Sequence, residues 1–313
     1  MTGARFVRFL DAAGGVHVGR VDPGAPARVL RLREPDVLAA LAGGGTPSGE
    51  SVEAVDPETL ELRAPSKLLA PVDAPEVWAA GVTYERSRAA RVEESRIKDV
   101  YGLVYAAERP ELFLKDAAGR RTVGPGAAVG VRGDSRWTVP EPELALVLGE
   151  GGELLGATIG NDVTARDVER VNPLYLPQAK LFAGACALGP AVVVPADWSE
   201  PFEIGCMVRD ETGAVVWTGA TSTARMRRSF TELAAWLVRD NPVPAGSVLL
   251  TGTGLVPPDE VSLAPGYAVE VAVAGIGRLV NVVAAAADLI AFAQSSEWKR
   301  EAPPSASRTE PVM

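Results

Sequence analysis

Residues 141–148 read EPELALVL, an apolar run that begins with two acidic residues. A short apolar run of this kind is typical of a buried β-strand. Residues i and i+2 of a strand point to the same side, so Glu141 and Glu143 are predicted to project side by side. Two carboxylates this close repel each other unless a cation lies between them. The alternative is a strand that faces solvent and carries its charges on the outer side.

A second acidic motif follows in the next predicted strand. Residues 154–159 read LLGATI and residues 160–167 read GNDVTARD, which places Asp162 where the strand is predicted to end. Three carboxylates without a thiolate or an imidazole select a hard cation. We therefore predict that Glu141, Glu143 and Asp162 hold Mg²⁺, with Mn²⁺ or Ca²⁺ as alternatives. Three protein oxygens leave about three positions of an octahedron open, which favours a catalytic site over a structural one.

The composition excludes several classes of protein. The formal net charge of −9 makes nucleic acid an unfavourable partner, because an acidic surface repels phosphate backbones. The single histidine, His17, argues against Ser-His-Asp catalysis and against a histidine-based zinc site. Two cysteines in 313 residues do not form a disulfide scaffold. No apolar window approaches the ~18 residues of a membrane helix, and no signal peptide is visible, so we predict a cytoplasmic protein without membrane contact.

The first 70 residues are predicted to form a small α+β domain. Residues 4–10 and 16–21 alternate apolar and polar positions around a turn, which predicts a β-hairpin. A short helix is predicted at 35–42, where a proline stands at the start and glycines follow the end. Residues 44–57 are predicted to be a loop, and 71–75 (PVDAP) a linker.

The remaining chain is predicted to be mainly β. A catalytic domain is expected at 71–290 and a C-terminal extension at 291–313, which is rich in proline and serine and is expected to be disordered from about residue 301. The capping pattern of Ser229 and Glu232 predicts a helix at 229–240. Further strands are predicted at 76–82, 143–148, 267–273 and 277–283.

Two lysines stand out because the chain has five lysines against twenty-six arginines. Lys115 lies in ELFLKD, and Lys180 lies in a predicted loop. A lysine can lose its proton when it is desolvated near a metal, whereas an arginine keeps its charge. Both are therefore candidate catalytic residues, with ordinary surface lysines as the alternative. Thr253 is a candidate donor to a substrate carboxylate, or a plain turn residue.

These motifs together resemble the fumarylacetoacetate hydrolase superfamily. The pattern E-x-E, followed by an aspartate in an N-D-x-T-A-R-D loop, matches Glu141, Glu143 and Asp162. Further matches are TGTG at 251–254 and GIGRLVN at 275–281, within a resemblance that covers about residues 75–285. The resemblance implies a mixed β-sandwich roll, a bound Mg²⁺, and a homodimer or higher homo-oligomer.

One segment distinguishes between branches of this superfamily. Its hydrolases and decarboxylases often carry G-x-N-Y-x-x-H-x-x-E, whereas this chain reads GVTYERSRAAR at 81–91. Thr83, Ser87 and Ala90 replace the Asn, His and Glu, which removes the pair that activates water. This variant, together with NPLYLPQAK at 172–180, resembles the 2-keto-3-deoxy-D-arabinonate dehydratase branch.

The resemblance implies a metal-dependent hydro-lyase acting on a 2-keto-3-deoxy sugar acid, a small 2-oxo acid, through an enolate. Lys180 is the candidate base, and Lys115, Ser87 and Thr253 are expected to orient the substrate. The other candidate substrate-binding residues are Thr83, Tyr84, Arg88, Arg166 and Asp167. The segment 84–107 is expected to close over the site. Alternatives are a C–C hydrolase, a decarboxylase, an isomerase or a tailoring enzyme of the same superfamily, and a non-catalytic protein that binds a small acid.

Overall fold

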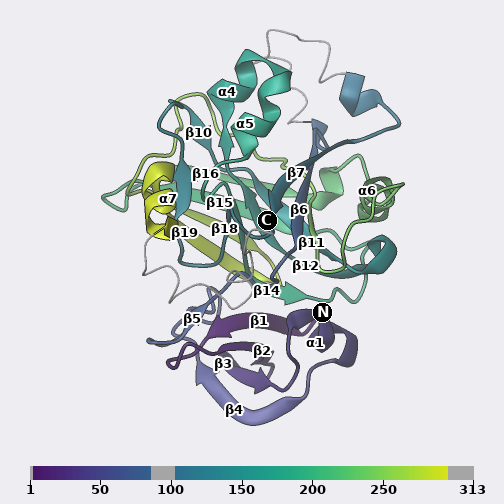
Figure 1. The fold of residues 1–313 in the computed structure, drawn as a ribbon, viewed down its shortest axis with the longest axis vertical. Helices are drawn as coiled ribbons and strands as arrows, with labels where there is room; N and C mark the ends of the chain where they lie inside the picture. The colour runs from purple at the N-terminus through teal and green to yellow at the C-terminus, as the bar shows by residue number, and fades with distance from the viewer. Residues whose placement is uncertain (1–2, 86–102, 295–313) are drawn as a thin grey trace, which may run out of the picture.

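The computed structural model describes residues 3–85 and 103–294, and the protein is built mainly from β-strands (Figure 1). Ten strands follow one another in the large sheet, in the order β4-β3-β2-β1-β14-β12-β11-β17-β6-β7, while β5 pairs with β1 and β8 with β14. Their bounds are β1 Arg5–Leu10, β2 Val16–Asp22, β3 Ala25–Leu32, β4 Pro47–Glu53, β5 Lys67–Leu68, β6 Glu76–Gly81, β7 Glu111–Ala117, β8 Thr122–Val123, β11 Pro142–Leu148, β12 Leu154–Asp162, β14 Cys186–Val193 and β17 Val248–Leu250.

A second sheet has five strands in the order β16-β15-β18-β19-β9, and a short pair, β10-β13, lies apart from both. The bounds are β9 Val129–Val131, β10 Thr138–Val139, β13 Thr164–Ala165, β15 Glu203–Arg209, β16 Val215–Ser222, β18 Ala268–Val273 and β19 Gly277–Ala285. In the part of the chain that the structure describes, the α-helices are α1 Val37–Gly43, α4 Arg166–Val171, α5 Leu176–Lys180, α6 Phe230–Leu237 and α7 Ala286–Gln294, and residues 103–106 are also helical. The short 3-10 helices are η1 Glu150–Gly152, η2 Pro173–Tyr175 and η3 Thr223–Arg225. Among the described residues, no helix is long and apolar enough to cross a membrane.

Strand β11, which contains the predicted 143–148 segment, lies at the centre of the molecule and is buried on both faces. Leu144, Leu146 and Leu148 join the core between the two sheets. Ala145 and Val147 point the other way, into a core shared with β1 and α1. The alternation places Glu143 on the same face as Ala145 and Val147. A strand buried on both faces has little freedom to move, so it gives the acidic pair a rigid base.

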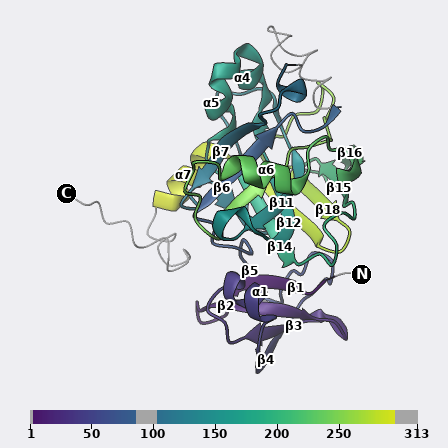
Figure 2. The ribbon, with the colours of Figure 1, turned by 90° about the vertical axis from the view of Figure 1, so that its right-hand side faces the viewer.

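The N-terminal strands extend the large sheet. Residues 4–10 and 16–21 form the predicted hairpin, with Phe6 opposite Arg20, and β1 also pairs with β14 through Arg5 and Val193. The expectation of a loop at 44–57 is wrong, because β4 pairs there with β3. The polar composition of β4 concealed it, since its side chains face solvent on an edge strand. Figure 2 shows these strands and α1 gathered at one end of the molecule.

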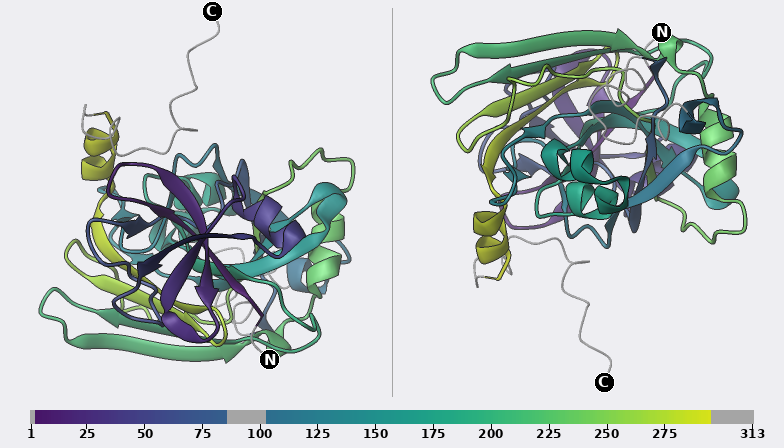
Figure 3. Two further views of the ribbon diagram at one scale, coloured as in Figure 1. Left: turned by 90° about the horizontal axis from the view of Figure 1, so that it is seen from below. Right: turned by 90° about the horizontal axis from the view of Figure 1, so that it is seen from above.

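The capping residues locate the starts of the helices more accurately than the predicted ranges do. Asp36 caps α1 by accepting a hydrogen bond from the amide of Ala39 at 2.8 Å, so this helix begins two residues after 35. Ser229 caps α6 in the same way on Glu232, as predicted, but α6 ends at Leu237. The sequence analysis did not anticipate α4, α5 or α7. Figure 3 shows α7 projecting from the side of the body, away from α6.

Candidate active site

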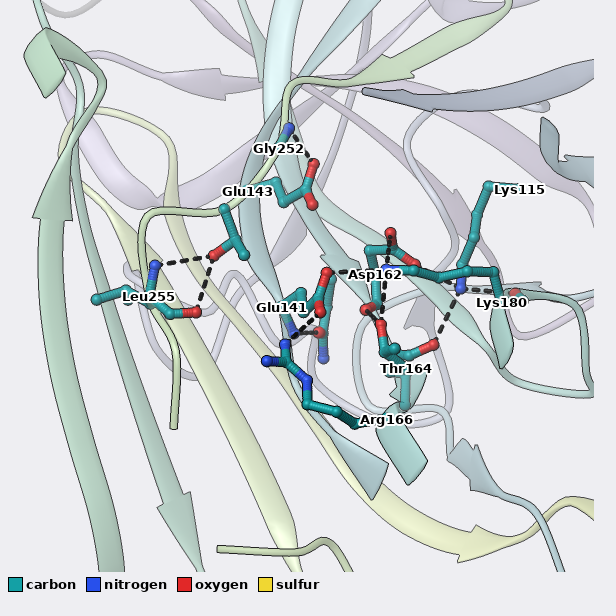
Figure 4. Close-up of polar contacts among 12 residues, drawn as sticks. Lys115, Glu141, Glu143, Asp162, Thr164, Arg166, Lys180, Gly252 and Leu255 are labelled. Carbon is teal, nitrogen blue, oxygen red and sulfur yellow. Dashed lines mark hydrogen bonds and ion pairs between the residues drawn. The ribbon is translucent and has the colours of Figure 1, made fainter. Parts of the chain in front are cut away.

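The three predicted metal ligands meet at the end of the β11–β12 hairpin. The register places Glu143 opposite Gly160, and the amide of Asp162 donates to the carbonyl of Glu141 at 2.9 Å. Each of Glu141, Glu143 and Asp162 offers one oxygen that lies within 4.8 Å of the other two, and all three residues are buried (Figure 4). Antiparallel pairing therefore brings together carboxylates that are about twenty residues apart in the chain.

A glycine fixes the orientation of Glu143. The amide of Gly252 donates to Oε2 of Glu143 at 2.6 Å. Gly252 has φ +91°, and a Cβ atom there would lie 2.0 Å from Oγ1 of Thr83. Both the backbone conformation and the close approach require glycine. The hydroxyl of Thr83 instead donates to the carbonyl of Thr251 at 2.7 Å, so this residue supports the loop at 251–254.

Lys180 connects two of the three carboxylates. It is the last residue of α5, whereas a loop had been predicted, and it is buried. Its ammonium group donates to Oε2 of Glu141 at 2.8 Å and to Oδ2 of Asp162 at 2.7 Å. The third hydrogen bond goes to the hydroxyl of Thr164, also at 2.7 Å. The candidate base thus lies directly beside the predicted metal ligands.

Arg166, at the start of α4, holds the other oxygen of Glu141. The distance from Nη2 to Oε1 of Glu141 is 2.6 Å, and the arginine is buried. Its guanidinium carbon lies 5.8 Å from the centre of the Trp137 ring. Arg166 therefore orients a predicted metal ligand. Its predicted contact with the substrate stays a prediction.

Lys115 lies behind Asp162. It contacts Oδ1 of Asp162 at 2.5 Å and donates to the carbonyls of Val163 at 3.0 Å and Lys180 at 2.7 Å. Burial lowers its pKa below the usual lysine value, and the Asp162 carboxylate opposes that shift. Lys115 does not line the pocket. It therefore contacts the carboxylate network and the main chain.

The carboxylate cluster suits a divalent cation. Burial, and then the neighbouring charges of Asp162 and Glu141, raise the pKa of Glu143 well above its usual value. Two oxygens bound to one Mg²⁺ or Ca²⁺ lie at most about 4 to 5 Å apart, since metal–oxygen distances run from about 2.0 to 2.6 Å. One oxygen from each of the three residues lies within 4.8 Å of the other two, which is within this range. The Lys180 ammonium, which bridges Glu141 and Asp162, shows that this site already attracts positive charge.

A pocket opens beside the carboxylates. Its wall includes Thr253, a candidate donor to the substrate, and the hydroxyl of Thr253 contacts the main chain of Leu255. The lining residues are Ala80, Gly81, Val82, Glu111, Phe113, Glu141, Glu143, Asp162, Glu169, Leu176, Lys180, Gly252 and Thr253. The pocket thus draws on β6, β7, the β11–β12 hairpin, both helices α4 and α5, and the loop at 251–254.

Two predicted substrate-binding residues, Asp167 and Tyr84, are not among the residues that line the described pocket. Asp167 accepts hydrogen bonds from the hydroxyl of Ser135 and the amide of Arg136, so its carboxylate orders the 132–137 turn outside the pocket wall. Tyr84 is buried, and its ring would be met by a Cβ atom added at Gly254. Ser87 and Arg88, and most of the segment expected to close over the site, lie outside the described residues.

Sequence reasoning missed two carboxylates in the pocket wall. Glu111 is the first residue of β7, and Glu169 lies three residues after Arg166 on α4. The sequence contains a weak signal for Glu169. Arg166 was already a candidate site residue, and Glu169 follows it by three residues, which places both on the same face of a helix. For Glu111 we find no local signal. Its position depends on the pairing of β7 with β6, which only the fold reveals.

Known proteins resemble this chain in both sequence and fold. The chain is 51% identical over 214 residues to the probable 2-keto-3-deoxyxylonate dehydratase of Haloferax volcanii, covering 68% of this chain and 73% of that protein. It is 40% identical over 266 residues to the 2-dehydro-3-deoxy-D-arabinonate dehydratase of Saccharolobus solfataricus, covering 82% and 89%. A solved structure of 2-keto-3-deoxy-D-arabinonate dehydratase complexed with magnesium and 2,5-dioxopentanoate matches with a TM-score of 0.78 and 36% identity, covering 89% of this chain and 98% of that one.

The family comparison agrees with these relatives. Residues 77–284 match the fumarylacetoacetate (FAA) hydrolase C-terminal family. This range contains the whole carboxylate cluster, both buried lysines and the loop at 251–254. The resemblance inferred from the sequence motifs, and the mainly β fold with mixed sheets that it implied, are both confirmed. The chain belongs to the fumarylacetoacetate hydrolase family.

Proposed function

We propose that this protein is a Mg²⁺-dependent hydro-lyase that dehydrates a 2-keto-3-deoxy sugar acid, such as 2-dehydro-3-deoxy-D-arabinonate, to 2,5-dioxopentanoate. The observation that carries the proposal is the buried trio Glu141, Glu143 and Asp162 with the Lys180 ammonium bridging two of its members. Support comes from two relatives named as dehydratases, at 51% and 40% identity.

Glu141, Glu143 and Asp162 would hold the cation. When bound there, Mg²⁺ supplies Lewis-acid stabilisation of the negative charge that develops on the 2-oxo oxygen. Gly252 and Arg166 keep Glu143 and Glu141 oriented, since each occupies one carboxylate oxygen. The other oxygen of Glu141, Oε2, accepts a hydrogen bond from Lys180, so both oxygens of this candidate ligand are held by neighbouring side chains.

Lys180 is the candidate base that removes the C3 proton. It acts in its neutral form, and its nitrogen then carries the abstracted proton as an ammonium group. In that state the contacts with Glu141, Asp162 and Thr164 satisfy its three N–H groups. The active site thus has acceptors ready for the protonated base. The same side chain can return the proton to carbon when the double bond migrates later in the reaction.

Loss of the C4 hydroxyl as water requires an acid. Of the pocket carboxyl groups outside the metal trio, Glu111 and Glu169 are the candidates. The C4 hydroxyl leaves as water with the proton of this acid, while the C3 proton stays on Lys180. The carboxylate formed from the acid then removes a C5 proton, and Lys180 returns a proton to C3, which moves the double bond to C4–C5. The resulting enol transfers its hydroxyl proton to C4 and becomes the aldehyde of 2,5-dioxopentanoate.

The same two carboxylates favour a particular kind of substrate. Carboxyl oxygens accept hydrogen bonds from hydroxyl groups. Within the described wall, Glu111 and Glu169 therefore favour a 2-oxo acid with a hydroxylated tail. This preference supports the dehydratase over a decarboxylase of oxaloacetate, whose tail carries no hydroxyl group. The two activities can therefore be distinguished by comparing a sugar acid with oxaloacetate as the substrate.

The test is a substrate panel with the purified protein and Mg²⁺. A 2-keto-3-deoxypentonate is expected to yield 2,5-dioxopentanoate, followed by NMR, while oxaloacetate is expected to release no more CO₂ than it does without protein. Catalysed CO₂ release without dehydration would redirect the assignment to a decarboxylase. Calorimetric binding of the sugar acid without any product would favour a binding protein.

Two further expectations accompany this proposal. The homodimer or higher homo-oligomer, implied by the resemblance, predicts a mass in light scattering of at least twice that of one chain. A cytoplasmic location is a further proposal, which cell fractionation tests. The division into residues 1–70, 71–290 and 291–313 is likewise a proposal, which limited proteolysis tests by cleavage near residues 70 and 290.

A further inference from the structure

The ammonium group of Lys115 is enclosed by the protein. Its side chain is 0% exposed. The ammonium donates hydrogen bonds to the carbonyls of Val163 and Lys180 and forms an ion pair with Oδ1 of Asp162. The aromatic ring of Phe182 lies 5.8 Å from the ammonium nitrogen and covers another side. Because the protein encloses this ammonium group, its interactions are with protein atoms.

The partners of Lys115 belong to the two functional parts of the site. Asp162 is a candidate metal ligand at the end of β12, and Lys180 is the candidate base at the end of α5. The two lysines divide the Asp162 carboxylate between them, with Lys115 on Oδ1 and Lys180 on Oδ2 (Figure 4). Lys115 also holds the main-chain carbonyl of Lys180, one of the last carbonyls of α5, which have no partner within the helix.

From this geometry we infer that Lys115 is a positioning residue that fixes the distance between the metal ligand Asp162 and the base Lys180. It does so from β7, a strand of the large sheet, so a single rigid element holds both parts. Lys180 must exchange its proton during turnover, and its contact with Asp162 Oδ2 changes as it does. Lys115 contacts the other oxygen, and its contact is independent of that exchange.

This inference rests on the proposed function for the role of Lys180, but its first test needs no substrate. Outer partners of metal ligands contribute to metal affinity, whereas a group that contacts only the substrate does not. Lys115→Met is therefore expected to weaken Mn²⁺ binding to the substrate-free protein about 10- to 100-fold, measured by electron paramagnetic resonance titration. The matched control is Lys67→Met, the same change at an exposed lysine, which is expected to bind Mn²⁺ as the unaltered protein does.

The second readout separates positioning from substrate contact. With saturating Mn²⁺, Lys115→Met is expected to lower kcat about 100-fold because the base is misplaced, while KM changes less than about fivefold. Exchange of the C3 protons of the sugar acid in deuterium oxide, followed by NMR, is expected to slow by the same factor as kcat. A merely structural role would reduce the active fraction and leave the kcat of the folded remainder unchanged.

Lys115→Arg covers the case in which Lys115→Met does not fold. Arginine keeps the positive charge but places it on a longer, planar group, which cannot reproduce three contacts around one nitrogen. It is expected to retain Mn²⁺ affinity within about threefold and to lose at least about tenfold in kcat. Full turnover in Lys115→Arg would overturn the inference.

The outcomes are distinguishable from failure of the proposed function. If the unaltered protein binds no Mn²⁺, both the metal site and this inference are overturned. If the unaltered protein binds Mn²⁺ and Lys115→Met binds it equally well, only the inference is overturned. If metal affinity is unchanged and KM alone rises, Lys115 contacts the substrate, as the sequence had suggested. If the unaltered protein binds Mn²⁺ but no sugar acid turns over, the loss of metal affinity in Lys115→Met still supports the inference.

Discussion

The β11–β12 hairpin and the α4–α5 segment meet at the same site, but they are built differently. The hairpin is buried along nearly its whole length, and β11 packs on both faces. The α4–α5 segment consists of two short helices around η2, with Leu174 82% exposed. The hairpin supplies the three carboxylates, and the helices supply Arg166 and Lys180. The groups that would bind the ion therefore stand on the rigid element, while the groups that act on those carboxylates stand on an element with little core of its own.

This difference suggests a division of labour. Isolated helices of five or six residues are unstable in water, so α4 and α5 depend on tertiary contacts. The ion pairs of Arg166 and Lys180 with the carboxylates are among those contacts. Metal binding and helix position are therefore expected to be coupled, with the hairpin as the fixed partner. The predictions below test that asymmetry, from the largest expected effect to the smallest.

Glu143→Ala is expected to abolish metal uptake and to lower turnover by at least about 10³-fold, because it removes one ligand of the ion that stabilises the developing charge. The fold should survive, since the change removes no apolar core. Mn²⁺ titration and the NMR dehydration assay measure the two effects, and circular dichroism reports the fold. Glu200→Ala, at an exposed glutamate, is the control. Full turnover in Glu143→Ala would remove Glu143 from the site.

Lys180→Met is expected to bind the metal no more weakly than Lys115→Met does, because each removes only an outer partner of the ligands, and to lose the proton transfer. Turnover should fall about 10²- to 10⁴-fold, the usual contribution of a general base, and solvent deuterium should no longer enter C3. Mn²⁺ titration and NMR in deuterium oxide separate the two effects. If Lys180→Met loses the metal as completely as Glu143→Ala does, the α4–α5 segment is as important for metal binding as the hairpin, contrary to the division proposed here.

Leu146→Ala tests the rigidity of the hairpin. Leu146 is fully buried between the sheets, so the cavity should lower the free energy of unfolding by about 2–5 kcal/mol. Denaturant unfolding with added Mn²⁺ measures the loss. A change below about 1 kcal/mol would mean that this part of the core adapts freely, contrary to the packing described.

Leu174→Ala is the matching change on the helical segment and the smallest effect expected. Because this side chain is mostly exposed, the free energy of unfolding should change by no more than about 0.5 kcal/mol. The same denaturant experiment measures it. A loss as large as that of Leu146→Ala would show that Leu174 is covered in solution, for example by a second copy of the chain.

Local sequence motifs predicted several elements of the fold. The strand at 143–148, the capped helix after Ser229 and the N-terminal hairpin all depend on contacts within a few residues, which a sequence pattern records. The pattern failed where local signals were weak. The edge strand β4 is polar and was taken for a loop, and α5, at five residues, is too short to show a helical period. Val72 and Ala74 of the predicted linker are buried, because the chain there packs on the core.

The sequence by itself determined which residues carry the acidic chemistry, since two carboxylates at i and i+2 and a third at the end of the next strand meet whenever the strands pair as a hairpin. The family and the mainly β fold followed from the same motifs. Only the tertiary structure decided that Lys115 serves Asp162 and Lys180, that Arg166 serves Glu141, and that Glu111 and Glu169 face the pocket. Strand order and helix docking set those distances, and because they depend on packing between segments far apart in the chain, no spacing within the sequence encodes them.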